Sequence, residues 1–341
     1  MRADRQSLVL ALSFVSVPVA AFLFLMDGGP YTDGVDPTAN YRRFEDPFLA
    51  ARYGDLESLQ GMLERRPDLL RETDRRGLTL LHYAALGDHS KVAEYLISKG
   101  ADVDARTNLG RTPLYAAADS GNLEVAKVLA YQGADVNARA SQPLSDVDAG
   151  DDDNILSAAA GSGNLKLVKW LLDKGAKVEY GRGETRNTAL HWAAHGVYNR
   201  RDDQPHKPYK LSNAAIIDLL AKHIGDINVR DGFGYTPLHR AAQSGAVTTV
   251  EHILETYPEV NVNARNHEAE TPLEVAVYEP IGAMTSEDYA AIVELLIDHG
   301  AKREKRNGRG EWLFDWTGEP TSPVILKALG MWRAVEAPKP E

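Results

Sequence analysis

A single phrase recurs along this chain of 341 residues and limits its fold more than any other feature. The phrase joins Thr-Pro-Leu, a run of small residues, a Gly-Asn-Leu turn, an apolar stretch and Gly-Ala-Asp-Val-Asn, and its clearest copy occupies residues 110–139. The leucine of the opening marks seven copies, at Leu81, Leu114, Leu156, Leu190, Leu238, Leu273 and Leu313. The first two marks lie 33 residues apart, and wider spacings later indicate insertions into the same unit. This period predicts a stack of units that bury one another's apolar faces.

Each position of the phrase has a physical reason. Thr112 suits an N-cap and Pro113 suits the first helical turn, because proline has no amide to leave unsatisfied. The alanines that follow keep this helix thin, so that neighbouring units can approach closely. Gly121 turns the chain into a second helix, and Gly133 suits the left-handed residue that ends it. The apolar face of the second helix comes from Leu123, Val125, Ala126, Val128 and Leu129.

These residues, in this order, resemble the ankyrin-repeat family, and the resemblance spans roughly residues 44–330. It implies an all-α solenoid of about eight helix-turn-helix-finger units, counting both caps. We divide the solenoid into an N-terminal cap at 44–75, repeats at 76–310 and a C-terminal cap at 311–330, followed by a tail at 331–341. The resemblance also implies that three repeat histidines form structural hydrogen bonds rather than a chemical site: His82, His191 and His239.

The N-terminus carries a second informative feature. Residues 8–26 contain no charge, and as a helix they would cross a hydrocarbon core. Arg2 and Arg5 precede this segment and aspartates follow it, so the positive-inside rule places the repeats outside the cytoplasm. We predict a signal anchor at 1–26 and a flexible linker at 27–43, in a single-pass protein of the bacterial inner membrane whose repeats face the periplasm. The alternative is a signal peptide cut near Ala21, which would leave a soluble periplasmic protein.

Composition and motifs argue against a catalytic, metal or cofactor site. The chain has no cysteine, which excludes disulfides and thiolate sites, and its net charge of −11 argues against nucleic-acid binding. His191 and His195 stand four residues apart, but Trp192 replaces the glutamate of a zinc-protease helix. We therefore expect no enzyme activity, no catalytic residue, no metal, no cofactor and no small-molecule substrate.

Three charged segments interrupt the repeats. Residues 141–154 are acidic, 197–212 are mainly basic, and 302–309 carry five lysines and arginines. Solvated loops are the plain interpretation of all three. The alternatives are a weak cation or basic-partner site in the first, a charge-patterned contact site formed by the first two, and membrane-headgroup contact by the third.

The remaining candidate is the surface by which ankyrin-like proteins hold protein partners, the finger tips and exposed edge of the first helices on the concave face. The resemblance maps this surface onto Arg52, Tyr53, Arg75, Arg76, Leu78, Leu86, Leu109, Arg111, Asp119, His195, Phe233, Tyr235, Gln243 and Tyr278. Arginine and aromatic residues dominate hot spots, and Phe233 is the strongest single candidate unless it packs on a neighbouring finger. We therefore expect a monomeric, non-catalytic binding module, either an immunity or inhibitor protein or a cell-envelope scaffold with several partners.

Overall fold

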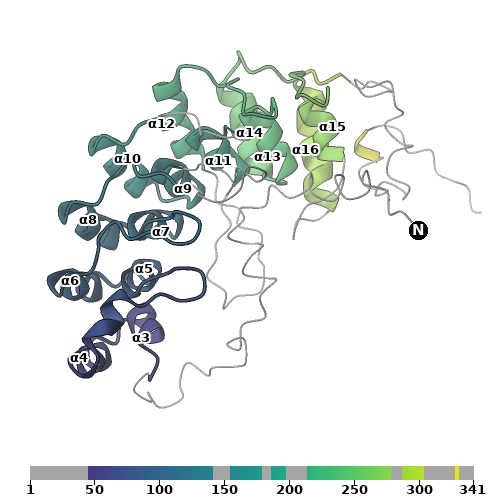
Figure 1. Cartoon of the computed structure of the whole chain (residues 1–341). Coiled ribbons are helices and arrows are strands. Elements are labelled where there is room, and N and C mark those ends of the chain that lie inside the picture. The colour runs from purple at the N-terminus through teal and green to yellow at the C-terminus, as the bar shows by residue number, and fades with distance from the viewer. Residues whose placement is uncertain are drawn as a thin grey trace, which may run out of the picture. The chain divides into compact units, whose positions relative to one another are not determined.

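The computed structural model describes residues 45–140, 154–178, 186–196, 213–277, 286–302 and 327–329 (Figure 1). Contacts divide the chain into Met1–Phe44 and Glu45–Glu341, and every described residue belongs to the second of these units. The predicted anchor, the linker, the tail and nearly all of the predicted C-terminal cap therefore lie outside the described residues, as do most of the three charged segments. Within the described ranges no helix has the length and apolar character needed to cross a membrane.

The described residues form pairs of short helices, with one isolated antiparallel bridge between Arg139 and Asn154. The first helices are α3 (Pro47–Tyr53), α5 (Leu80–Leu86), α7 (Pro113–Asp119), α9 (Ile155–Gly161), α11 (Ala189–His195), α13 (Pro237–Gln243) and α15 (Pro272–Val277). The second helices are α4 (Leu56–Arg65), α6 (Ser90–Ser98), α8 (Leu123–Tyr131), α10 (Leu165–Asp173), α12 (Ala214–Ile224), α14 (Val247–Thr256) and α16 (Ser286–Asp298). A short 3₁₀ helix, η1 (Pro67–Arg71), follows α4.

The first helices pack against one another in chain order, from α3 through to α15, and each contacts the second helix of its own unit (Figure 1). The unit that begins at Leu313 lies outside the described residues. The expectation of an all-α array of stacked helix pairs is thus confirmed for the part of the chain that the structure describes.

The N-termini of the first helices form as the phrase predicts. Thr112 accepts a hydrogen bond from the Tyr115 amide at 3.2 Å, and Pro113 opens α7. At α9, where neither residue of the Thr-Pro pair is present, Asn154 takes over the cap and accepts from the Ser157 amide at 2.8 Å. Both caps satisfy an amide that has no partner within its own helix.

The core follows the register of the phrase. The six marking leucines that the structure describes are all buried, from Leu81 to Leu273. The alanines of the first helices, such as Ala117 and Ala241, have no exposed surface, so the first helices approach without bulky side chains between them. Burial of this apolar surface against the next unit is what stabilises helices too short to persist alone.

Asparagines connect the units at both ends of the second helices. Asn122, at the start of α8, donates from its side chain to the carbonyl of Ala85 in the preceding unit at 2.8 Å. Beyond the end of α8, Asn137 donates to the Gly175 carbonyl at 3.1 Å and accepts from the Lys177 amide at 2.9 Å. The asparagines of Gly-Asn-Leu and Asp-Val-Asn therefore recur because each unit must satisfy backbone groups of its neighbour.

The repeat histidines are structural. His82 accepts from the Thr79 amide through Nδ1 at 3.1 Å, so Nε2 carries the proton and donates to the Arg111 carbonyl of the next unit at 3.0 Å. His191 and His239 repeat the arrangement toward the Tyr235 and Glu270 carbonyls, at 3.0 and 3.1 Å. Burial lowers the pKa of each of these three histidines to about 4. The structural role expected for them is confirmed.

The fingers that precede the first helices turn through a left-handed residue. Gly77, Gly110 and Gly234 occupy this position, with φ between 69° and 80°. In the finger before α15 the same position is held by Ala269, at φ 63°. An L-residue with a side chain is strained there, whereas glycine is not.

Ala269→Gly should therefore stabilise the protein by about 0.5–1 kcal/mol, because it removes a left-handed alanine. Gly234→Ala is the matched change at the equivalent position of another finger. It should destabilise the protein by more than Ala269→Gly stabilises it. A Cβ at Gly234 would lie 2.9 Å from the His267 amide nitrogen, in addition to the strained φ. Urea denaturation of the full-length protein measures both. Equal effects of the two substitutions would contradict this explanation.

The three buried histidines should also make stability depend on pH. Their folded-state pKa of about 4 lies below the unfolded value near 6.5, so the unfolded chain binds more protons between these values. The stability they contribute is present above pH 6.5 and is lost as the pH falls toward 4, by about 2 kcal/mol per histidine at pH 5. Urea midpoints of the native protein and of His239→Gln measure this loss. The variant should lose less stability than the native protein between pH 7 and pH 5, and identical losses would contradict the assignment.

Candidate functional site

Four fingers are described, at residues 74–78, 107–111, 231–235 and 266–270. We call them fingers 1, 2, 5 and 6, and numbers 3 and 4 are kept for the units of α9 and α11. Each is closed by a hydrogen bond from the amide of its first residue to the carbonyl of its last, such as Asp74 to Leu78 at 3.0 Å and Asp231 to Tyr235 at 2.9 Å. We call these fingers, together with the last turns of the first helices from α3 to α13, the finger surface. It contains thirteen of the fourteen predicted binding residues, and Tyr278 lies outside the described residues.

Finger 1 presents arginines around a fixed carboxylate. Asp74 accepts from the amides of Arg76 and Leu78 at 2.9 and 2.8 Å, and from the Tyr83 hydroxyl at 3.0 Å. Burial and the neighbouring Asp74 raise the pKa of Tyr83, which keeps its hydroxyl protonated as a donor. Arg75 and Arg76 remain exposed, with Arg76 also paired with Asp74 at 3.3 Å, and Leu78 is half-buried. Finger 1 thus offers cationic side chains on a backbone that Asp74 holds in place.

Finger 2 is joined directly to finger 1. Asn108 donates from its amide to the Arg76 carbonyl and from its side chain to the Arg75 carbonyl, both at 2.9 Å. Leu109 and Arg111 are half-buried, and the Arg111 guanidinium lies 5.0 Å from the centre of the Tyr115 ring. Fingers 1 and 2 therefore form one surface, mainly basic, on a chain whose net charge is −11.

Finger 5 carries Phe233 at its tip, with 40% of its surface exposed. The backbone beneath the ring has its polar groups engaged. The amides of Phe233 and Tyr235 both donate to Asp231 Oδ1 at 2.9 Å, and the Phe233 carbonyl accepts from the His267 amide at 2.9 Å. Phe233 is therefore held in a fixed position and offers a partner its side chain alone.

A buried ion pair supports this tip. Arg240, on α13, donates from Nε to Asp231 Oδ2 at 3.0 Å, with a second contact from Nη2. The side chain of Asp231 is fully buried and that of Arg240 is 5% exposed, so the two charges depend on each other. Arg240 also donates to Gln243 Oε1 at 3.1 Å, and its guanidinium lies 4.5 Å from the centre of the Tyr235 ring. Burial raises the pKa of Tyr235 to about 12.

The last turns of the first helices supply the other predicted residues. Tyr53 is 61% exposed, whereas Leu86, Asp119, His195 and Gln243 are half-buried at the equivalent position of later units. Burial, with a smaller contribution from the Arg240 charge, lowers the pKa of His195, so it is a neutral group in this surface. Arg52 is half-buried at the end of α3.

Sequence reasoning missed two large residues that contact this surface. Arg240 follows the repeat histidine where other units have a small residue or an aromatic, and a buried arginine requires an acidic partner that the repeat pattern does not specify. Trp192 occupies the same position on α11. It is half-buried, and its ring centre lies 6.4 Å from that of His195. The sequence feature that could have revealed both residues is a large side chain at a position within a run of small residues.

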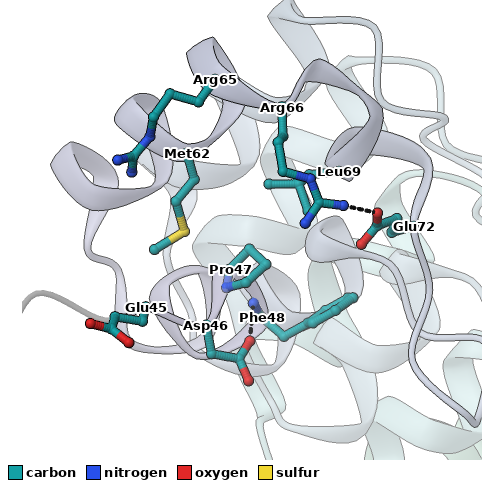
Figure 2. Close-up of a pocket in the computed structure, with 9 residues that line it drawn as sticks. All are labelled: Glu45, Asp46, Pro47, Phe48, Met62, Arg65, Arg66, Leu69 and Glu72. Carbon is teal, nitrogen blue, oxygen red and sulfur yellow. Dashed lines mark hydrogen bonds and ion pairs between the residues drawn. The ribbon is translucent and has the colours of Figure 1, made fainter.

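Two features of the described residues concern metal and small-ligand sites. These residues contain no group of three or more histidines and carboxylates placed to hold a metal ion. A pocket of about 430 Å³ lies in the first unit, between α3, α4 and η1 (Figure 2). Asp46 in this pocket caps α3 by accepting from the Phe48 amide at 2.8 Å, and Arg66 pairs with Glu72. These polar groups serve the fold of the first unit.

Stacked helix pairs with projecting fingers define an α-helical repeat protein of the binding class. The family model for ankyrin repeats matches residues 48–140 and 209–308, which is more than half of the chain, so the protein belongs to the ankyrin-repeat family. Ankyrin repeats are protein-binding modules, and they imply a protein partner for this chain.

Similar proteins share parts of the array. The chain is 39% identical over 84 residues to alpha-latrotoxin-Lh1a of Latrodectus hasselti, covering 23% of this chain and 6% of the toxin. It is 35% identical over 116 residues to the human SMC5-SMC6 complex localization factor protein 1, covering 33% of this chain and 10% of that protein. It spans only a small fraction of these relatives' length.

Among solved structures, similarity is found to a chain in the complex of a predatory endopeptidase from Bdellovibrio bacteriovorus with an immunity protein. The identity is 24% and the TM-score 0.45, with 62% of this chain and 98% of that chain covered.

The buried pair gives a test of how finger 5 is held. Arg240→Met leaves the Asp231 carboxylate buried without its guanidinium and should cost about 3–5 kcal/mol of stability. The double variant Asp231→Asn with Arg240→Met removes both charges and should be more stable than the single variant. Urea denaturation gives both values. A single variant within 0.5 kcal/mol of the native protein would show that the pair does not hold the finger.

Proposed function

We propose that this protein is a non-catalytic binding module, exposed outside the cytoplasm, that holds one protein partner on its finger surface. The proposal makes it an immunity or inhibitor protein that blocks a secreted toxin or an envelope enzyme. The observation that carries it is Phe233, an exposed aromatic ring on a finger tip whose backbone is already fixed.

Preorganisation is the physical basis of the proposal. A partner that receives Phe233 does not have to order the finger, because Asp231 and Arg240 hold it in the free protein. Aromatic and arginine side chains provide most hot-spot energy, and the same surface carries Arg75, Arg76 and Tyr235. A dedicated inhibitor needs this combination of a rigid apolar anchor and peripheral charges.

The location outside the cytoplasm rests on the sequence. Residues 8–26 are uncharged, with arginines before them and aspartates after them. We propose that this segment anchors the array to the bacterial inner membrane, with the repeats in the periplasm. A bound toxin or enzyme would then be neutralised at the membrane surface.

The experiment is cross-linking in intact cells with a photo-reactive amino acid at position 233, followed by mass spectrometry of the captured proteins. The expected result is one dominant partner. Binding of that purified partner is then compared for the native protein, Phe233→Ala and Phe233→Leu. Loss of the ring should weaken binding by about 2 kcal/mol, or roughly thirtyfold, with a smaller loss for leucine, which keeps an apolar side chain.

Two outcomes would contradict the proposal. A broad set of envelope proteins, captured equally by the native protein and the variants, would indicate a cell-envelope scaffold. A single partner that binds Phe233→Ala as tightly as the native protein would place the interface elsewhere. Circular dichroism melting is the control for folding of each variant.

A further inference from the structure

The second helices carry an exposed cluster that the finger surface does not include. It lies on α8, on α10 and at the residue that follows α10, and we call it the cationic-aromatic patch. Its exposed members are Tyr131, Lys166, Lys169 and Lys174, and its fifth member, Trp170, is half-buried. Tyr131 is 69% exposed, more than any other large apolar side chain in the described part of the chain. None of these residues belongs to the repeat pattern that builds the core.

The aromatic part of the patch is ordered by contacts between units. The rings of Tyr131 and Trp170 meet edge to face, with their centres 6.4 Å apart. The Lys174 ammonium lies 4.9 Å from the centre of the Tyr131 ring and 5.9 Å from that of Trp170. The two rings and the ammonium therefore form one surface feature, apolar on its face and positive at its edge.

The two lysines in the first half of α10 lack the glutamate partner that the equivalent lysine has one unit earlier. In α8, Glu124 accepts from Lys127 at 2.8 Å. The equivalent positions of α10 are Lys166 and Lys169, both exposed, and neither makes a hydrogen bond or ion pair within the described ranges. Two like charges three apart on a helix disfavour it, whereas the pair in α8 favours it. The lysine at 166 thus replaces a stabilising interaction with exposed positive charge on a chain of net charge −11.

The neighbouring second helices limit what can dock there. On α6 the exposed Glu94 is accompanied by exposed Lys91, and exposed Lys99 follows the helix, whereas α14 carries exposed Glu251 and Glu255 without a lysine. A flat anionic bilayer laid across this row would meet these carboxylates as well as the lysines. A narrow acidic chain seated on α8 and α10 would meet only Glu124, which pairs with Lys127, and Asp173, and charge complementarity therefore favours a polypeptide segment.

The size of the patch sets the length of that segment. Lys166 and Lys174 are separated by about 12 Å along the helix direction, at 1.5 Å per residue. An extended segment of about four residues covers this distance at 3.3 Å each. Two or three carboxylates and one apolar side chain would satisfy the lysines, the exposed Tyr131 ring and the half-buried Trp170 ring.

We propose that the cationic-aromatic patch is a second docking surface, for a short acidic polypeptide segment that carries an apolar side chain. The segment's carboxylates pair with Lys166 and Lys169, and its apolar side chain packs on Tyr131 and Trp170. This surface is independent of the finger surface and of the partner proposed for it.

The test uses the full-length protein and a fluorescein-labelled pentapeptide with two glutamates on each side of a leucine. Fluorescence anisotropy at low salt should show saturable binding that weakens as salt is raised. Lys166→Glu should weaken binding about tenfold without lowering the melting temperature, because it recreates the pair that α8 contains. Lys222→Glu on α12 makes the same charge change at an exposed position outside the patch and should leave binding unchanged.

Absent peptide binding, or equal weakening by Lys166→Glu and Lys222→Glu, would overturn the proposal. So would flotation with phosphatidylserine vesicles that depends on Lys166 while peptide binding does not, since the patch would then serve a membrane. Phe233→Ala should leave peptide binding unchanged, so failure here and failure of the finger-surface proposal are separate results.

Discussion

A hydrogen bond from a buried histidine to the finger of the next unit holds three of the four described fingers in place, and the rigidity of the finger surface depends on it. The accepting carbonyl, such as that of Tyr235, already receives the amide of Asp231, which closes the finger. His191 adds a second donor from the preceding unit at 3.0 Å. The closed finger is thereby joined to the first helix of the preceding unit, and this contact makes the finger tip rigid. Because burial keeps these histidines neutral, a single tautomer serves every such junction.

Units without the histidine are joined to their neighbours by other contacts. Tyr115 holds the equivalent position of α7, and Ser157 that of α9. The stack continues there through Asn164, which donates to the Gly121 carbonyl of the preceding unit at 2.7 Å. The array therefore tolerates variation at any single contact, because burial between first helices and several side-chain-to-backbone bonds act at each junction. This tolerance leaves the finger tips free to vary, and Phe233 is such a variation.

Much of the fold could be predicted because its determinants are local. The caps, the buried leucines and the left-handed Gly133 follow from spacing within one unit, and the structure confirms them. The histidine bonds followed from the family resemblance. The pair of Asp231 and Arg240 could not be predicted in this way, since no other unit has both residues and their contact depends on how a finger folds over its own helix. The contact between Tyr131 and Trp170 could not be predicted either, because the two residues belong to different units and an insertion separates these units in the sequence.

The central claim is that the finger surface, held rigid from below, is where the partner binds. Hydrogen exchange of backbone amides in the full-length protein, free and with the captured partner bound, tests it most directly. We expect slower exchange in the bound state at residues 231–235 and at the adjoining fingers. Unchanged exchange in every finger, with slower exchange confined to other segments, would contradict the claim.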